Sequence, residues 1–300
     1  MRLGSLFSCV LCLTAAASAA EPSAVENSSP RPTLGWNPAG VYGGSATNAE
    51  ILANAKYLHD KLLSHGWNTV ALAASAGRDE AGRTALAASI HRLGLNLVPS
   101  AAPREVGDRW ADVDLRFDLL WRATASSSLG RGFDVGLIPL GHAAVRNSAA
   151  GPDRPTRLTR DEQITLLSLA DLAASPLVLS MNLPDNDDWT RSLLTNEEAL
   201  AIDQDRGDQP VRRLVRKGTS EVWAKSLAGG DLVLGFFNRG EQVTTVKVFW
   251  PEAGLSGPYW VRDIWNLQDR PEADRGLEVE VTPHGAVLVR LHQISAKPTG

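Results

Sequence analysis

The chain has 300 residues, of which 43% are hydrophobic and 21% are charged, and its formal net charge is −4. This apolar content is enough for a sizeable buried core, so the composition excludes a wholly disordered chain. The weak negative charge excludes a broad basic surface, so we expect no nucleic-acid partner. No run of 18 apolar residues follows residue 20, so we expect no membrane span in the mature chain.

The first twenty residues have the three parts of a secretory signal peptide. Met1-Arg2 gives a positive start, a mostly apolar stretch follows, and Ala17-Ser18-Ala19 is an A-x-A cleavage site. The alternative, an uncleaved anchor, would need a longer apolar stretch. We therefore predict a signal peptide over residues 1–20, a flexible lead-in over 21–32 and a secreted or periplasmic protein. Both cysteines lie in the signal peptide, so the mature chain would contain none.

Residues 33–208 alternate short apolar runs with helical patterns, which is typical of parallel βα units. Two helices begin at capping boxes, Thr47 with Glu50 and Thr159 with Glu162. The expected strands are 33–37, 68–74, 95–98 and 175–181. The expected helices are 47–66, 84–93, 110–121, 159–173 and one that opens at 195–198. We therefore expect one α/β domain over this range.

From residue 209 the pattern changes to β-rich runs separated by turns that contain Gly and Pro. The expected strands are 232–238, 244–250, 259–265, 277–281 and 286–291. We predict an antiparallel β-sandwich over residues 209–293 and a tail over 294–300. Trp260 and Val261 are neighbours in a strand, so one side chain should point inward and the other outward. We expect most of the tryptophans in the core, although an indole can also stack on a sugar ring.

Several segments, in this order, resemble the melibiase-type α-galactosidases of glycoside hydrolase family 27. Residues 34–37 correspond to the family's first barrel strand, and residues 90–97 to the start of its third strand. Residues 159–205 correspond to the last helix, strand and helix of the barrel, and residues 283–288 to the closing strand of the sandwich. The resemblance implies an α/β fold, a (β/α)8 TIM-type barrel followed by a C-terminal antiparallel β-sandwich. It also implies retaining hydrolysis of terminal α-galactosides.

The α/β part is too short for a complete barrel. Thr33 to Asp205 spans 173 residues, whereas a complete barrel takes about 250. At roughly 30 residues per βα unit, about two units are missing. The gap in the resemblance falls between Val98 and Arg104. We therefore predict an incomplete barrel with open sheet edges, which an oligomer would cover.

The family's chemistry needs two carboxylates, a nucleophile and an acid/base, roughly 5–5.5 Å apart. The family's nucleophile is an Asp two residues after a Lys, and no Lys-x-Asp occurs before residue 210. The family's acid/base is an Asp four residues after an Arg, and Arg104 and Asp108 have this spacing. The resemblance therefore implies Asp108 as acid/base and Arg104 as a sugar-binding side chain. The alternative is a surface pair before a helix, and Asp112 or Asp134 would have to supply the nucleophile.

Other positions that contact the sugar in the family have changed. Ala73-Ala74-Ser75-Ala76 replaces an Asp-Asp-Gly-Trp, and methyl groups cannot make the charge-assisted hydrogen bonds of carboxylates. Trp36 and Asp134 keep the family's residue types, so with Arg104 they are the expected substrate-binding residues. The expected ligand is a galactoside or another glycan.

We expect neither a metal ion nor a cofactor. The six histidines form no H-x-x-x-H or H-E-x-x-H pair, and the mature chain has no thiolate. Two functional hypotheses follow from the resemblance and from its gaps. The first is an α-galactosidase-like hydrolase that is weak or inactive because the nucleophile strand is missing. The second is a non-catalytic pseudoenzyme that binds a carbohydrate or a protein.

Overall fold

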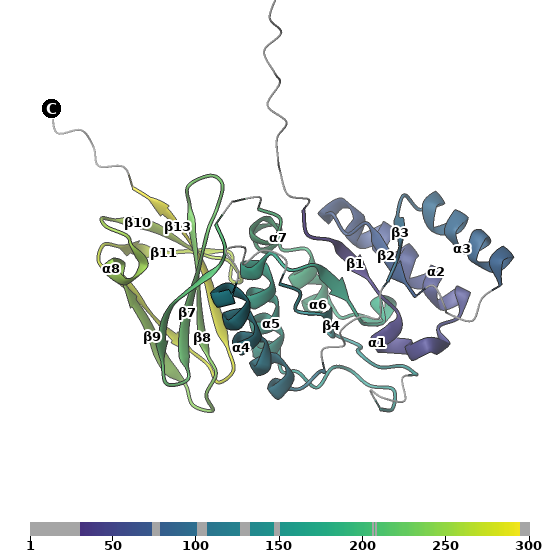
Figure 1. Cartoon of the computed structure of the whole chain (residues 1–300), viewed down its shortest axis with the longest axis horizontal. Helices are drawn as coiled ribbons and strands as arrows, with labels where there is room; N and C mark the ends of the chain where they lie inside the picture. Colours follow the sequence, from purple (N-terminus) through teal and green to yellow (C-terminus); the bar gives the residue numbers. More distant parts are fainter. Residues whose placement is uncertain are drawn as a thin grey trace, which may run out of the picture.

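The computed structural model describes residues 31–73, 79–100, 107–126, 133–146, 151–205, 207 and 209–294. Figure 1 shows two parts side by side, an α/β part that contains β1 to β5 and an antiparallel part that contains β6 to β13. The predicted signal peptide and most of the lead-in lie outside the described residues, as do Ala74–Ala76, Arg104 and most of the predicted tail.

A parallel sheet in the order β3-β2-β1-β5-β4 forms the centre of the α/β part. Its strands are β1 (Leu34–Trp36), β2 (Thr69–Leu72), β3 (Asn96–Pro99), β4 (Leu137–Ile138) and β5 (Leu177–Leu179). In a closed barrel every strand has two neighbours, whereas β3 and β4 are the edges of this sheet. The predicted incomplete barrel is confirmed. The described residues of the α/β part hold five parallel strands, one fewer than the six that two missing units would leave.

The helices of this part begin where the sequence supplies caps. In both predicted capping boxes the Thr side chain accepts a hydrogen bond from the backbone N–H of the Glu, and the Glu side chain accepts one from the backbone N–H of the Thr. The helices are α1 (Ala39–Tyr42), α2 (Asn48–Tyr57), α3 (Glu80–Arg92), α4 (Trp110–Ser126), α5 (Arg160–Ala173), α6 (Asp188–Leu194) and α7 (Glu197–Asp203). Shorter helical turns occupy Gly43–Ser45, Leu58–Leu62, Leu63–His65 and Leu183–Asp185.

The antiparallel part is a six-stranded sheet in the order β11-β10-β13-β8-β7-β6, accompanied by the pair β12-β9. Its elements are β6 (Arg212–Lys217), β7 (Ser220–Ser226), β8 (Leu232–Asn238), β9 (Thr244–Phe249), α8 (Trp250–Ala253), β10 (Tyr259–Asp263), β11 (Gln268–Ala273), β12 (Gly276–Val281) and β13 (Ala286–Gln293). The predicted sandwich is confirmed. Trp260 is 53% exposed and Val261 is 2% exposed, as their alternation predicts.

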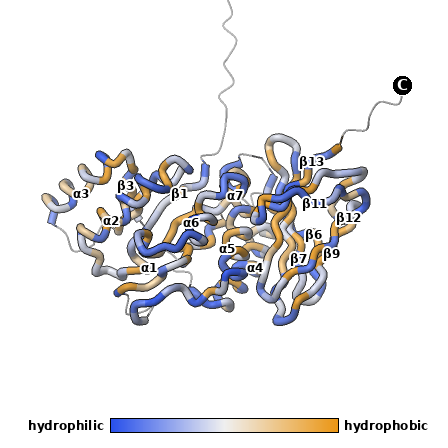
Figure 2. Tube along the Cα trace, turned by 180° about the vertical axis from the view of Figure 1, so that it is seen from behind, coloured by the Kyte–Doolittle hydropathy of each residue, from blue (hydrophilic) through white to orange (hydrophobic). Residues whose placement is uncertain are grey.

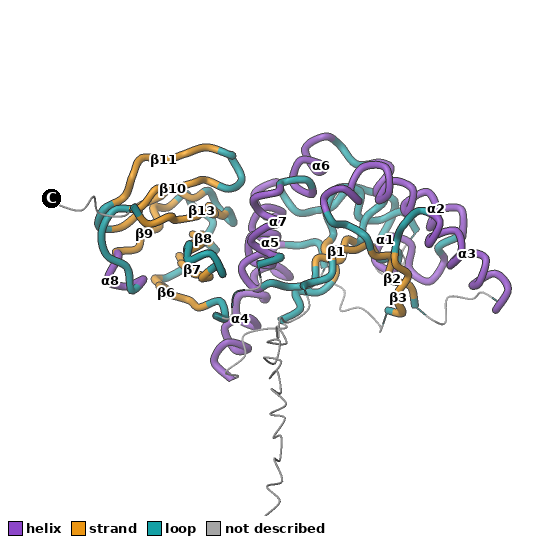
Figure 3. Tube along the Cα trace, turned by 90° about the horizontal axis from the view of Figure 1, so that it is seen from above, coloured by secondary structure: helices purple, strands orange, loops and turns teal. Residues whose placement is uncertain are grey.

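Apolar side chains of the two parts meet in a cluster of their own. Figure 3 shows α4, α5 and α7 between the parallel strands and the sandwich, and Figure 2 shows apolar segments along the sandwich strands. Phe117 of α4 packs edge-on against Phe237 of β8, with ring centroids 5.0 Å apart. Trp223 of β7 and Leu172 of α5 are buried in the same cluster. The barrel remnant and the sandwich therefore share a hydrophobic core.

Candidate functional site

The candidate site lies where the segments after β4 and β5 leave the parallel sheet. Active sites of α/β barrels form at the carboxyl ends of the strands. β4 runs into residues 139–146 and 151–158, and β5 runs into residues 180–187. Asp108 lies just before α4, and its contacts are with the first of these two segments. Its placement therefore agrees with a position on the catalytic side of a barrel.

Arginine side chains hold the Asp108 carboxylate. Arg154 donates to both carboxylate oxygens, and its Nη2 lies 3.1 Å from Oδ1. The backbone N–H of Arg157 donates to Oδ2 at 3.1 Å, and Nη1 of Arg157 donates to Oδ1 at 3.1 Å. Only 11% of the Asp108 side chain is exposed. Asp108 therefore fastens residues 154–157 to the start of α4.

The surroundings of Asp108 favour its ionised form. Burial alone would raise the pKa of this carboxyl, but the hydrogen bonds from Arg154 and Arg157 and their positive charges outweigh burial and lower the pKa. A general acid that works near neutral pH needs a raised pKa so that it still carries a proton. Asp108 is therefore poorly suited to protonate a leaving group.

The other residues considered for catalysis have different surroundings. Asp112 lies in the first turn of α4, and its Oδ2 accepts a hydrogen bond from the backbone N–H of Arg109 at 3.3 Å. Asp134 is exposed, precedes β4 at the amino end of that strand, and accepts a hydrogen bond from the backbone N–H of Gly136 at 2.7 Å. The structure brings neither carboxylate into contact with Asp108 in the described residues.

Trp36 is part of the hydrophobic core. Its side chain is fully buried, and its indole N–H donates to the backbone oxygen of Met181 at 2.7 Å. A ring that stacks on a sugar needs an exposed face, and Trp36 has none. The predicted role of Trp36 in substrate binding is therefore not supported by its packing, and the alternative of a core tryptophan describes its position.

A polar network that the sequence analysis did not find lies near the carboxyl ends of β1 and β5. The hydroxyl of Tyr42 donates to Oδ1 of Asn182 at 2.8 Å, and Nδ2 of Asn54 donates to the same hydroxyl at 3.2 Å. Burial raises the pKa of Tyr42, so the phenol stays protonated and can act as the donor. Asn182 directly follows the strand predicted over residues 175–181. A polar residue at the carboxyl end of a buried strand is the signal in the sequence for this network.

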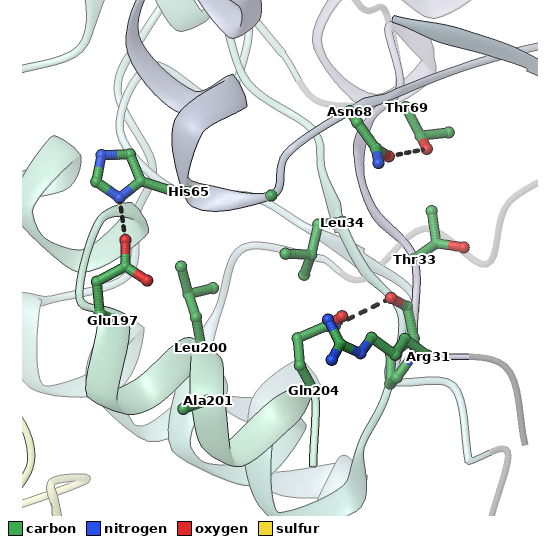
Figure 4. A pocket seen from close by; sticks show the side chains of 12 residues that line it. Arg31, Thr33, Leu34, His65, Asn68, Thr69, Glu197, Leu200, Ala201 and Gln204 are labelled. Carbon is green, nitrogen blue, oxygen red and sulfur yellow. Dashed lines mark hydrogen bonds and ion pairs between the residues drawn. The ribbon is translucent and has the colours of Figure 1, made fainter. Parts of the chain in front are cut away.

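Two hollows lie near the ends of the parallel strands. One, of about 500 Å³, is lined by residues of the segments after β4 and β5 and by the first turns of α5 and α6. The other, of about 470 Å³, lies at the amino ends of β1 and β2, beside α7 (Figure 4). In the second, His65 contacts Glu197, and Gln204 donates to the backbone oxygen of Pro32 at 3.0 Å. The first hollow is the one on the side where barrel enzymes bind their substrates.

No metal centre and no membrane-spanning helix are found among the residues that the structure describes. No three or more His, Cys, Asp or Glu side chains there are grouped as metal ligands. No helix in those ranges combines the length and the apolar composition needed to cross a bilayer.

Comparisons with known proteins identify relatives of both parts of the chain. Residues 217–291 match the family model described as the α-galactosidase C-terminal β-sandwich domain. α-Galactosidase 2 of Arabidopsis thaliana is 25% identical over 189 residues, which cover 62% of this chain and 44% of the relative. α-Galactosidase A of Aspergillus niger is 30% identical over 145 residues, which cover 47% and 26%. The chain thus spans less than half the length of these curated relatives.

Solved structures show the same fold. A family 27 β-L-arabinopyranosidase from Geobacillus stearothermophilus superimposes with a TM-score of 0.80 at 22% identity, covering 89% of this chain and 97% of that one. An α-galactosidase from Saccharomyces cerevisiae superimposes with a TM-score of 0.65 at 12% identity, covering 88% and 98%. At these identities the likeness defines the fold alone.

Proposed function

We propose that this chain, a shortened relative of the melibiase-type α-galactosidases, binds a glycan with a terminal galactose-like sugar and does not hydrolyse it efficiently. We further propose that it acts outside the cytoplasm, because its first twenty residues read as a signal peptide. The curated relatives are α-galactosidases, which supports a carbohydrate as the ligand. In this proposal the protein binds the same class of sugar as its relatives but does not carry out their reaction efficiently.

The contacts of Asp108 are the observation that carries this proposal. Asp108, the carboxylate that the resemblance assigns as acid/base, is bound by two arginines that lower its pKa. A second carboxylate as nucleophile is required for retention, and no Lys-x-Asp precedes residue 210. The double-displacement reaction needs both of these groups, whereas binding requires neither a proton donor nor a nucleophile.

Hydrolysis of terminal α-galactosides is the second candidate function. The resemblance of residues 159–205 to the family's last helix, strand and helix favours it, together with the position of Asp108 on the side of the sheet where barrel active sites form. In that case Asp108 would be the acid/base, Arg104 and Asp134 would contact the sugar, and Asp112 or Asp134 would have to act as nucleophile.

One assay separates the two functions. The mature protein at high concentration is mixed with p-nitrophenyl α-galactoside, and phenolate release is followed over many hours in wild type and in Asp108→Asn. The proposal predicts that release stays at the rate of the buffer in both. Turnover in wild type that disappears in Asp108→Asn, with the variant still folded, would establish the second function and refute the first.

A further inference from the structure

We propose that the hollow after β4 and β5 is the glycan-binding site of this protein, and that it takes an uncharged sugar ring. This inference rests on the function proposed above and gives it a location. The volume of about 500 Å³ falls within the roughly 300–1,000 Å³ of small-molecule sites. The lining residues come from the segments that follow β4 and β5 and from the first turns of α5 and α6.

Carboxylates that line the hollow can accept hydrogen bonds from sugar hydroxyls. His142 lies between Asp153 and Asp185, with its ring nitrogens 2.7 and 3.2 Å from their oxygens. A neutral imidazole has one N–H and can donate to one of these carboxylates at a time. The side chains of Asp153 and Asp185 are 65% and 55% exposed. Each carboxylate has more acceptor positions than its contact with His142 uses, so both can receive hydroxyl protons.

Arg160 and Trp189 bring donors and an aromatic ring to the lining of the same hollow. The guanidinium of Arg160 lies over the ring of Trp189, with its central carbon 4.7 Å from the ring centroid. Arg160 opens α5, and Trp189 lies in the first turn of α6. A guanidinium held on an indole is fixed in orientation and keeps N–H groups at its rim for hydroxyl oxygens. Hydrogen-bond acceptors, hydrogen-bond donors and an indole in one hollow are the groups that recognise a sugar.

The charges around the hollow favour an uncharged ligand. Asp153, Asp185 and Asp187 line the hollow together with Arg154 and Arg160, and the Arg154 guanidinium is bound to Asp108. Hydrogen bonds from Thr190 lower the pKa of Asp187, which stays ionised at neutral pH. An anionic ligand would meet these carboxylates, and no metal-binding group occurs among the described residues. A neutral polyhydroxyl compound can donate to the carboxylates and accept from Arg160 without bringing a further negative charge to the hollow.

Calorimetric titration with galactose tests this location. The test variant carries Asp153→Asn and Asp185→Asn, which remove the charge of two exposed side chains and keep their size. The matched control is Asp269→Asn on the sandwich, where the carboxylate is 79% exposed and pairs with Arg262. We expect the double variant to bind galactose on the order of tenfold more weakly, the control to bind as wild type does, and wild type to bind galacturonate more weakly than galactose.

The outcomes distinguish the location from the function. If wild type binds galactose and the double variant binds it equally well, the hollow is not the site, although the protein still binds sugar. If wild type gives no heat at millimolar galactose, melibiose or raffinose, the proposed function fails and the location fails with it. Hydrogen exchange gives a second readout that needs no variant. Galactose should slow exchange in residues 151–158 and 183–190, and slower exchange only elsewhere would overturn the location.

Discussion

The contacts of Asp108 determine what its carboxylate can do. The resemblance implied a position just before a helix, and Asp108 lies there, two residues before α4. Its role as acid/base stays a prediction. Its partners could not be predicted from local patterns, because Arg154 and Arg157 lie 46 and 49 residues further along the chain. The same limit applies to Trp36, because a residue type shared with a family does not show whether its ring faces the sugar or the core.

Replacing Asp108 by Asn should destabilise the folded protein. The substitution leaves Arg154 and Arg157 without their counter-charge in a nearly buried place, so we expect the free energy of unfolding to fall by about 2–4 kcal/mol. Because the pKa of Asp108 is lowered in the folded state, this stabilisation is present above the ordinary value of 3.8 and is lost as the pH falls below it. Urea unfolding at pH 7 and at pH 3 measures both effects. Equal stabilities at pH 7 would contradict the role given to the arginines.

Lys225, Asp171 and Asp203 are buried together at the junction of the two parts. They should make the protein less stable as the pH rises, whereas Asp108 makes it less stable as the pH falls. Nζ of Lys225 donates to the backbone oxygens of Asp171 and Ile202. Burial raises the pKa of Asp203 to about 7 and also raises that of Asp171. A raised pKa gives stability that is complete below the ordinary value near 3.8 and is lost as the pH rises through about 7.

We therefore expect the free energy of unfolding of wild type to fall between pH 5 and pH 8. In Asp203→Asn the fall should be smaller, because Asn resembles the protonated carboxyl and cannot ionise. Urea unfolding across this range checks the prediction. Parallel pH profiles for wild type and variant would show that Asp203 ionises in the folded state as readily as in the unfolded chain.

Among the elements, those with strong local signals were predicted and those without them were not. Both capping boxes and the five predicted sandwich strands are present. β6 (RRLVRK) and β11 (QDRPEA) were missed because they are the two edges of the six-stranded sheet, where polar residues and a Pro are tolerated. β7 was missed because its buried Glu221 and Lys225 interrupt the apolar pattern.

The open edge of β3 carries its own protection against pairing. The backbone N–H groups of Asn96 and Ser100 donate to the β2 side, at Asn68 and Leu72. Backbone groups alternate sides along a strand, so Leu97 and Pro99 face the open edge, and Pro99 has no N–H to donate. A further strand that paired with this edge would therefore lack the backbone hydrogen bond that an N–H at position 99 would donate.

Replacing Pro99 by Thr should promote association. The substitution restores an N–H at the open edge and adds a residue that favours strands. In sedimentation velocity, we expect Pro99→Thr to form larger species than wild type does at the same protein concentration. Identical sedimentation of the two proteins would show that Pro99 does not protect this edge. Whether wild type itself forms an oligomer over the open edges stays a prediction.

The whole molecule depends on the junction between its two parts. The length of the α/β segment predicted an incomplete barrel. It could not predict that α4 and α5 pack against the sandwich. Arg239 of the segment after β8 donates to Asp114 at 2.6 Å and to Glu221 at 2.7 Å, which joins α4 to the sandwich. This ion-pair group borders the apolar cluster around Phe117. The sandwich thus covers helix faces that the open barrel would otherwise leave exposed.

Truncating Phe117 should therefore destabilise both parts together. Phe117 is fully buried, and replacing a buried Phe by Ala costs about 3–5 kcal/mol. We expect one cooperative unfolding transition in wild type and in Phe117→Ala, at a lower urea concentration in the variant. Far-UV circular dichroism and tryptophan fluorescence should report the same midpoint. Two separate transitions would show that the sandwich and the barrel remnant fold independently.

Binding without hydrolysis is tested most directly by one calorimetric trace, recorded while melibiose is injected into the wild-type protein. The account predicts heats that saturate with added ligand and a thermal power that returns to baseline after each injection. A sustained power in proportion to the protein concentration, with galactose accumulating in the cell, would show turnover and contradict the account.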